Sequence, residues 1–382
     1  MTGEEVNVVK EQQELNQETK DQEPEISYKT IVLTGTGGYD KLKVEVKKGA
    51  PTLKSGEILV RVQACGLNFS DLLIRQGTFS KHTSLGSECA GVVEAIGDDV
   101  TDRKVGDKVI VLNVDGGLWA ELVATKVIHT FLMPDGMSFQ DAAAISVNYI
   151  VAYMMINDYA NLRPNQSILI HMAAGGVGIA ATQLSKLVKD VTIFGTASTS
   201  KHETIKENGV THPIDYITMD YAEEVRKISP KGIDIVLDPL GGADNAKGFG
   251  LLKPLGKLII YGAANLVTAP KRSPLIAAKV WWHKFNIDAF QLMNSNKAVC
   301  GFHLGRTDPE QVAEVVGKLI LLYNEGKIKP KVDSVWSFEQ IGDAMKHMQE
   351  HKNIGKIILV PEVKTTDATT TDATTEAKTT EN

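Results

Sequence analysis

The chain has 382 residues, 43% hydrophobic and 23% charged, which suits a globular protein with room for two domains and excludes a fibrous or wholly disordered chain. Its formal charge of −6 lies at the ends: residues 1–27 carry eight acids against two lysines and residues 361–382 carry five acids against two lysines, so the ends sum to −9 and the body carries +3. A nearly neutral body argues against a nucleic-acid binder, which needs a concentrated basic face to displace phosphate counterions.

The two ends are predicted to be disordered arms. Residues 1–27 contain few large apolar groups, and residues 361–382 repeat Asp-Ala-Thr-Thr from Asp367 and again from Asp372. Neither segment can bury enough apolar surface to offset the entropy lost on ordering. Glu4 and Glu5 stand where a signal peptide needs apolar residues, and three cysteines are too few for a four-cysteine zinc lobe. We therefore expect a reducing compartment and no disulfide framework.

The first folded part of the chain, residues 28–126, is predicted to be a small β-barrel. Its apolar runs are short and are separated by turn residues such as Gly97-Asp98. This spacing is typical of a barrel. The predicted strands are Ile58–Gln63, Ala90–Ile96, Lys108–Leu112 and Trp119–Ala124.

One longer apolar stretch raises the question of a membrane span. It runs from Ala142 to Ile156 and is interrupted by Ser146 and Asn148. A spanning helix needs ~20 apolar residues. The stretch therefore predicts a buried helix, and any association with a membrane is expected to be peripheral.

From Ser167 the pattern changes to strand, glycine turn, helix and strand. This alternation predicts a parallel sheet with helices on both faces, an α/β fold with a doubly wound Rossmann-type sheet. The predicted strands are Ser167–Met172, Asp190–Phe194, Ile233–Leu237, Lys257–Tyr261 and Val299–Leu304. Two helices, Glu310–Tyr323 and Phe338–His351, are predicted next, the second opening with a capping box of Ser337 and Gln340. The last strand, Asn353–Val360, is expected to return to the first domain.

The strongest local motif is His171-Met-Ala-Ala-Gly-Gly-Val-Gly178. Ala173, Gly175 and Gly178 occupy the small-residue positions of a dinucleotide-binding turn, where the backbone approaches a pyrophosphate at a helix N-terminus. The alternative is a tight turn without a ligand. Because a strand, a helix and a further strand stand where the motif requires them, the motif predicts a nucleotide-binding loop.

The end of the next predicted strand favours NADPH. NAD-specific versions of the motif carry an acid about 20 residues further on for the ribose 2′-hydroxyl. Here the chain reads Gly195-Thr-Ala-Ser-Thr-Ser-Lys201, with no acid before Glu203. Such a site would accept a 2′-phosphate, whereas the alternative is that Lys201 is only a solvated lysine at the start of a helix.

Several runs resemble a known family, the quinone oxidoreductase branch of the medium-chain dehydrogenase/reductase superfamily. The runs that carry this resemblance are Cys65–Asp71, Arg75–Gly77, Gly86–Gly91, Ala173–Gly178 and Lys257–Gly262. Further runs resemble a vesicle-associated group within that branch: Asp238–Gly242, Leu251–Pro254, Ala298–His303, Ile328–Pro330, Asp333–Trp336 and Asn353–Lys356. The resemblance covers residues 28–360. It implies a GroES-like catalytic domain in two parts, 28–150 and 305–360, around an NADP-binding Rossmann domain at 151–304.

The resemblance also implies roles for individual residues. Asn68 would lie beside the nicotinamide and the substrate, as the catalytic residue. The cofactor-binding residues would be Ala173, Gly175, Gly176, Val177 and Gly178 at the pyrophosphate, Ser198, Lys201 and Tyr216 at the 2′-phosphate, Gly262 at the nicotinamide, and Asn353 and Lys356 close by.

The resemblance further implies that no metal takes part. Zinc-dependent members place a cysteine where this chain has Asn68 and a histidine where it has Ser87. Zinc is bound by thiolate, imidazole or carboxylate, so neither residue is a credible ligand. Cys65 stands three residues away and is interpreted as a buried barrel cysteine.

Two other motifs have structural explanations. His347-Met-Gln-Glu-His351 spells a zinc-binding pattern, but it lies in the last turn of an amphipathic helix, where the helix dipole favours histidine, and no third ligand is indicated. Trp281-Trp282 could anchor the chain at an interface, although an aromatic pair more often lies in a core or between subunits.

Together these features predict a zinc-independent, NADPH-dependent oxidoreductase that reduces a quinone or a conjugated carbonyl. The resemblance implies a homo-oligomer, a dimer or larger, in the cytoplasm and peripherally associated with synaptic vesicle membranes or the mitochondrial outer membrane, with a membrane-protein partner there. The alternative function is an NADPH-binding regulatory or interaction protein at those membranes, with weak catalysis or none.

Overall fold

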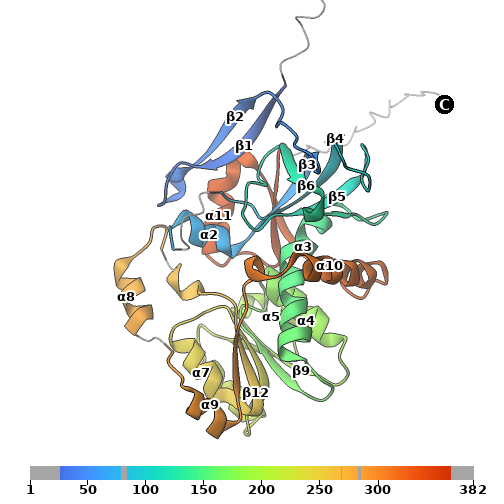
Figure 1. Ribbon diagram of the computed structural model, residues 1–382. Helices are drawn as coiled ribbons and strands as arrows, with labels where there is room; N and C mark the ends of the chain where they lie inside the picture. The colour runs from blue at the N-terminus through green and yellow to red at the C-terminus, as the bar shows by residue number, and fades with distance from the viewer. Residues whose placement is uncertain (1–25, 79–83, 268, 283–284, 363–382) are drawn as a thin grey trace, which may run out of the picture.

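The computed structural model describes residues 26–78, 84–267, 269–282 and 285–362. The predicted arms therefore lie almost entirely outside the described residues, although Ser27 already belongs to the first strand. The chain forms two domains that share one long helix (Figure 1).

The upper part of Figure 1 is the β-rich domain, and its strands come from both ends of the described chain. A hairpin of β1 and β2 flanks a seven-stranded sheet in the order β14-β15-β3-β4-β5-β7, with β6 paired to β3. Its strands are β1 (Ser27–Leu33), β2 (Leu42–Lys48), β3 (Glu57–Leu67), β4 (Glu88–Ile96), β5 (Lys108–Leu112), β6 (Leu122–Lys126), β7 (Thr130–Leu132), β14 (Val332–Ser337) and β15 (Lys356–Val360), and its helices are α2 (Phe69–Arg75), α10 (Pro309–Asn324) and α11 (Ile341–Gln349). The expected return of the last strand is confirmed, since β15 pairs antiparallel with β3.

The lower part is the predicted parallel sheet, with six strands in the order β10-β9-β8-β11-β12-β13. Its strands are β8 (Ser167–Ile170), β9 (Thr192–Ala197), β10 (His212–Asp215), β11 (Ile233–Asp238), β12 (Leu252–Ile260) and β13 (Ala298–Gly301), and its helices are α4 (Gly176–Lys186), α5 (His202–Asn208), α6 (Tyr221–Ile228), α7 (Ala243–Leu251), α8 (Pro274–Trp282) and α9 (Ala289–Ser295). In sequence order this is 3-2-1-4-5-6, the order of a dinucleotide-binding sheet, and the fold class is confirmed.

Some predicted strand limits were wrong. The strand predicted at Trp119–Ala124 begins only at Leu122, because the backbone before it bonds to β1: the Ile31 N–H donates to the Trp119 carbonyl at 2.8 Å and the Glu121 N–H donates to the Lys29 carbonyl at 2.9 Å. Strand β13 ends at Gly301, three residues before the predicted limit. Strand β10 was missed, since it has four residues and contains Pro213, which only an edge strand tolerates.

The predicted buried helix is the element that joins the domains. Helix α3 (Phe139–Tyr153) continues as a π-helix, η3 (Met154–Ala160), and packs on α4, α10 and the barrel strands. Residues 139–160 are long and apolar enough to cross a membrane, but 72% of the apolar window is buried inside the protein. This is the behaviour of a core helix, and the prediction of a buried helix is confirmed.

Candidate functional site

The glycine loop lies at the carboxyl end of β8 and leads directly into α4. Gly178 must remain a glycine, because a Cβ there would overlap the Met172 carbonyl oxygen. The backbone N–H groups of Gly176, Val177 and Gly178 have no acceptor among the described residues. Three free donors at the positive end of a helix form a binding site for an anion. Ala173 lies beneath them, fully buried against the sheet.

The segment before β15 lies across this loop. Gly355 donates from its N–H to the Ala174 carbonyl at 2.8 Å, and Gly175 and Gly355 form a parallel bridge. The Asn353 side chain donates to the Gly355 carbonyl at 2.9 Å and so stabilises the turn. The structure therefore brings the turn that contains Asn353 against the glycine loop.

Lys201, which belongs to the domain with the parallel sheet, also contacts the segment before β15. Its ammonium donates to the carbonyls of His351 and Asn353, at 2.6 and 2.8 Å. Partial burial lowers the pKa of Lys201, and burial next to this ammonium likewise lowers the pKa of His351. Lys201 is thus not a freely solvated lysine, and one of its three donors remains available for a ligand.

The two other residues predicted at a 2′-phosphate, Ser198 and Tyr216, directly follow the ends of the neighbouring strands β9 and β10. Asp215 pairs with Ala197 in the register of β10 and β9, so Tyr216 and Ser198 follow side by side. The Ser198 hydroxyl lies 3.3 Å from that of Ser200, and about half of Tyr216 is exposed.

Sequence analysis missed an acid at this place. Asp215 approaches from β10, and its carboxylate accepts hydrogen bonds from the Thr199 and Thr218 hydroxyls at 2.7 and 2.9 Å. A third bond comes from the Ile217 N–H at 3.1 Å, and these donors lower the pKa of Asp215. The carboxylate is therefore held by donors from its own loop and from the segment after β9. The short strand that carries it gave no sequence signal.

Gly262 lies at the ends of β11 and β12, where nucleotides bind in such sheets. A Cβ at Gly262 would come within 2.7 Å of the Pro239 carbonyl. The N–H of Ala264 donates to that same carbonyl at 2.8 Å. Close packing of two backbones therefore explains the glycine.

Asn68 belongs to a buried cluster that sequence analysis did not identify as a unit. Its amide nitrogen donates to Glu88 at 2.8 Å, and its amide oxygen accepts from the Lys356 ammonium at 2.6 Å. Lys356 also forms an ion pair with Glu88, and both side chains are at least 97% buried. We call Asn68, Glu88 and Lys356 the buried charge cluster. In this cluster Lys356 contacts Asn68. Lys356 also lines a crevice next to Gly176, which is described below.

Helix α3 completes the surroundings of Glu88. The Val147 N–H donates to the carboxylate at 2.7 Å, and the Ser146 hydroxyl donates to the same oxygen. Ser87, beside Glu88 in sequence, has its hydroxyl 3.5 Å from the Asn68 amide nitrogen. The sequence signal for Glu88 was its place in the family run Gly86–Gly91. Its role as the acceptor for four donor groups is visible only in the tertiary structure.

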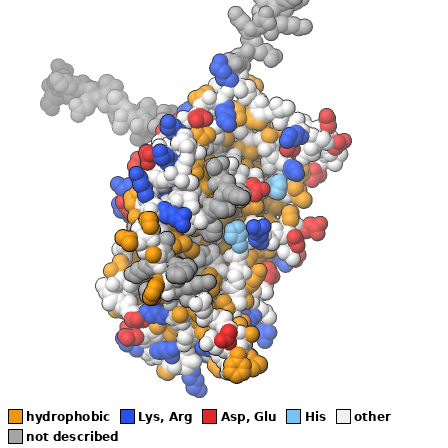
Figure 2. Space-filling model, turned by 60° about the vertical axis from the view of Figure 1, so that its left-hand side comes forward, with side chains coloured by type: hydrophobic (Ala, Val, Ile, Leu, Met, Phe, Trp, Pro, Cys, Tyr) orange, Lys and Arg blue, Asp and Glu red, His pale blue; other side chains and the backbone are white. Residues whose placement is uncertain are grey.

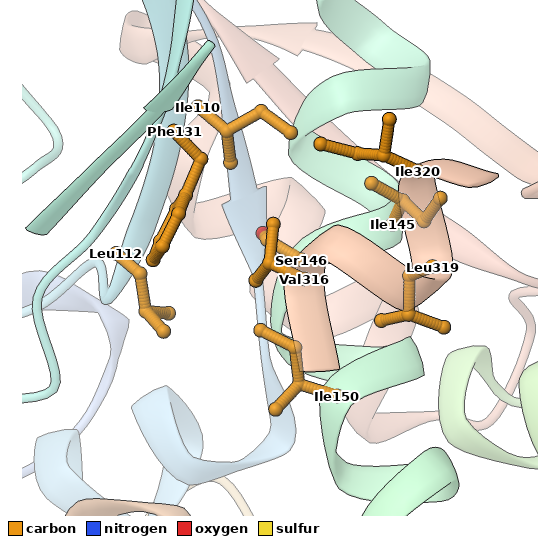
Figure 3. A pocket seen from close by; sticks show the side chains of 9 residues that line it. All are labelled: Ile110, Leu112, Phe131, Ile145, Ser146, Ile150, Val316, Leu319 and Ile320. Atoms are coloured by element: carbon orange, nitrogen blue, oxygen red, sulfur yellow. The ribbon is translucent and has the colours of Figure 1, made fainter. Parts of the chain in front are cut away.

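A small, mainly apolar cavity lies beside Ser146. Figure 3 shows the side chains that line it, from α3, α10, β5 and β7: Ile145, Ser146, Ile150, Val316, Leu319, Ile320, Ile110, Leu112 and Phe131. None of the predicted cofactor residues lines this cavity.

The two motifs given structural explanations can now be placed. His347 lies 3.0 Å from Asp333, while α11 ends at Gln349, so that Glu350 and His351 follow the helix. Within the described part of the chain, no three His, Cys, Asp or Glu side chains are grouped as a metal site. Cys65 is fully buried, as predicted, and burial raises the pKa of its thiol well above the ordinary range. Trp282 is 80% exposed, so it is not a core residue.

Comparison with known proteins identifies the family. Residues 54–135 match the alcohol dehydrogenase GroES-like domain, and residues 208–359 match the zinc-binding dehydrogenase family. Synaptic vesicle membrane protein VAT-1 of Tetronarce californica is 80% identical over 93% of this chain and 94% of its own length. The chain belongs to the VAT-1 family of the medium-chain dehydrogenase/reductase superfamily. The predicted resemblance is confirmed.

Proteins similar to this VAT-1 family member include an oxidoreductase and a solved VAT-1 relative. Human quinone oxidoreductase is 28% identical over 85% of this chain and 95% of its own length. The crystal structure of the human VAT-1 homolog-like protein has a TM-score of 0.76 at 41% identity, covering 90% of this chain and 100% of that one.

Two further solved structures share the fold. The CurK enoyl reductase has a TM-score of 0.73 at 28% identity and covers 87% of this chain and 99% of its own. A mycobacterial protein solved in complex with NADPH has a TM-score of 0.76 at 24% identity, covers 87% of this chain and 100% of its own, and shows likeness of fold alone.

Proposed function

We propose that this protein is a zinc-independent, NADPH-dependent oxidoreductase that reduces quinones or conjugated carbonyls. The observation that carries the proposal is the glycine loop, where three backbone N–H groups without acceptors open α4 at the carboxyl edge of the sheet. This geometry suits the pyrophosphate of a dinucleotide. The kinship with quinone oxidoreductase and enoyl reductase supports hydride transfer to an electrophilic acceptor.

The residues at the ends of β9 and β10 support NADPH over NADH. Lys201 retains one free donor, and a charge-assisted bond to a 2′-phosphate is stronger than a bond to a neutral hydroxyl. Asp215 follows next to this position in the strand register, but its carboxylate already accepts hydrogen bonds from Thr199 and from its own loop.

When bound, the cofactor would supply the hydride, and the chain would bind and orient the reactants. Asn68 donates one amide N–H to Glu88 and the other to the Ser87 hydroxyl oxygen, at 3.5 Å. Because the second bond is long, this N–H and the Ser87 O–H are the donors that could polarise an acceptor oxygen. The Lys356 ammonium, 2.6 Å from the Asn68 oxygen, would repel a metal ion at that point. The donor set therefore supports zinc-free chemistry.

The test is NADPH oxidation against a panel of quinones and enones, together with elemental analysis of protein purified without chelators. We expect turnover with some of these acceptors, faster with NADPH than with NADH, and no stoichiometric zinc. One tightly bound zinc per chain would restore the alcohol dehydrogenase alternative. NADPH binding without turnover would favour the second function below.

The second candidate is an interaction protein at vesicle or mitochondrial outer membranes, in which the fold serves binding. The exposed apolar side chains of α8 and α9 favour it: Leu275, Trp282 and Phe290 are 83%, 80% and 67% exposed. Figure 2 shows hydrophobic side chains lying among Lys and Arg on one face of the molecule. The relatives' names place them at synaptic vesicle membranes.

Alkaline extraction of membranes from cells that express the chain tests this association. We expect release into the soluble fraction, since the apolar window of residues 139–160 is mostly buried in the core. Retention with the lipid would mean that the attachment is not peripheral. Light scattering of the purified protein measures the proposed homo-oligomer, and a monomer would contradict that part of the proposal.

A further inference from the structure

Asn148 is a buried polar residue to which no function has yet been given. It lies in α3, on the side that packs against α4, and is only 5% exposed. Its amide nitrogen lies so close to Gly176 that a Cβ at that glycine would overlap it. The first residue of α4 is thus in direct contact with this amide.

The Asn148 side chain has no hydrogen-bond partner among the described residues. Its neighbours in α3 differ in this respect, since the Ser146 hydroxyl donates to Glu88 and the Tyr149 hydroxyl donates to Gln183 at 2.8 Å. Buried amides are nearly always paired, because leaving one unpaired costs the free energy of its lost hydration. An unpaired amide at 5% exposure therefore indicates a partner that binds from outside the chain.

The surroundings of this amide show the chemistry of that partner. Asn148 lines a narrow crevice whose wall includes Gly176, Lys331 and Lys356. The free N–H groups at the start of α4 lie on the same loop. No carboxylate lines the crevice, and Glu88 lies behind Lys356, paired with it. Donors and cations without acids are the complement of a phosphate.

We propose that Asn148 binds the pyrophosphate of the dinucleotide, with its amide N–H completing the ring of donors formed by the glycine loop. This inference rests on the proposed function and adds a binding residue to it. It also explains Gly176 separately from Gly178: Gly176 leaves room for the Asn148 amide, whereas Gly178 leaves room for the Met172 carbonyl.

The test compares ligands that have a diphosphate with one that has none. Dissociation constants of NADPH, NADH, ADP-ribose and adenosine 2′-monophosphate are measured by calorimetry for the wild type, Asn148→Ala and Asn148→Asp. The first three carry the diphosphate, and the last carries only the phosphate expected at Lys201. Asn157→Asp is the matched control, because it makes the same charge change at an exposed position of η3, where the Asn157 amide donates to the Tyr153 carbonyl at 3.0 Å.

We expect Asn148→Ala to weaken the three diphosphate ligands about tenfold to a hundredfold, the loss of one hydrogen bond to a charged group. Asn148→Asp should weaken them further by repulsion, while adenosine 2′-monophosphate and the control remain unchanged. Thermal unfolding without ligand checks the fold, and if the Asp variant does not fold, the Ala variant decides.

Unchanged affinities for all three diphosphates in folded Asn148→Ala would overturn the inference, as would an equal loss for adenosine 2′-monophosphate. A wild type that binds none of the dinucleotides would instead overturn the proposed function. The two failures are therefore distinguishable.

Discussion

The glycine loop and the buried charge cluster differ in what they are made of. The loop offers backbone N–H groups over three consecutive residues, and its side chains matter mainly by being small. The cluster consists of side chains from three distant places, with Asn68 and Lys356 separated by 288 residues in the sequence. A site made of backbone is encoded locally, whereas a site made of charged side chains depends on the whole fold being assembled. Four changes test this contrast.

The largest effect is expected from breaking the cluster. Lys356→Met leaves the Glu88 carboxylate buried without its cation, which should lower the free energy of unfolding by about 3–5 kcal/mol. The double variant Glu88→Gln/Lys356→Met should recover much of that loss, because no unpaired charge remains. Denaturant titration measures both.

Lys318→Met is the control for the cluster, since Lys318 pairs with Glu314 on an exposed face of α10. It should leave the unfolding midpoint unchanged. If the single and double cluster variants are equally unstable, the cost comes from packing and not from an unpaired charge.

The next effect concerns pH. Burial raises the pKa of Asp71, whose carboxylate accepts from the N–H groups of Asn68 and Gly86, from 3.8 to about 6. The folded state therefore binds a proton more tightly than the unfolded state. The resulting stability is fully present below the unfolded pKa near 4 and is lost as pH rises through about 6, a change of ~3 kcal/mol.

Asp71→Asn removes this titration. Subtracting the variant's unfolding free energies from those of the wild type between acid and neutral pH isolates the contribution of Asp71 from those of other groups. The difference should fall as pH rises and level off above about 7. A difference that is constant with pH would show that Asp71 has the same pKa in both states.

A smaller and more selective effect is expected at Lys201. Lys201→Ala should weaken NADPH about tenfold to a hundredfold and leave NADH nearly unchanged, because only NADPH presents a phosphate there. Calorimetric titration gives the four dissociation constants. Lys206→Ala, which removes an exposed lysine bonded to Glu203, is the control.

Equal losses for both cofactors would have a definite meaning. They would show that Lys201 acts through its bonds to the His351 and Asn353 carbonyls, which join the two domains, and not through a phosphate. Equal wild-type affinities for NADPH and NADH would remove the basis for preferring NADPH.

The smallest effect is expected from removing the arms. Deleting residues 1–25 and 363–382 should not shift the unfolding midpoint, because both segments lack core-forming residues. The deletion stops short of Ser27, which pairs with Lys48 in the hairpin of β1 and β2. A clear fall in the midpoint of the shortened chain would show that an arm contributes to the folded state.

Local pattern was sufficient for much of the fold. Strand β5 was predicted at its observed limits, Lys108–Leu112, and the capping box of Ser337 and Gln340 is present. Most other predicted strands have limits within a few residues. The hairpin of β1 and β2 was not predicted. Its strands are mostly half-exposed or exposed, and Ile31 is their one buried residue, so the apolar signal is weak. Propensity and periodicity report only contacts near in sequence.

The sequence by itself determined the order of elements, the glycine turn and the absence of an acid between Gly195 and His202, because each depends on neighbouring residues. Tertiary structure alone decided which charges meet. It brought Lys201 to carbonyls 150 and 152 residues away, gave Glu88 its partners, set Asp215 beside Thr199 and left Asn148 unpaired against Gly176. The physical reason is that the free energy of a buried polar group depends on its partners in space, and nothing in a local pattern specifies them.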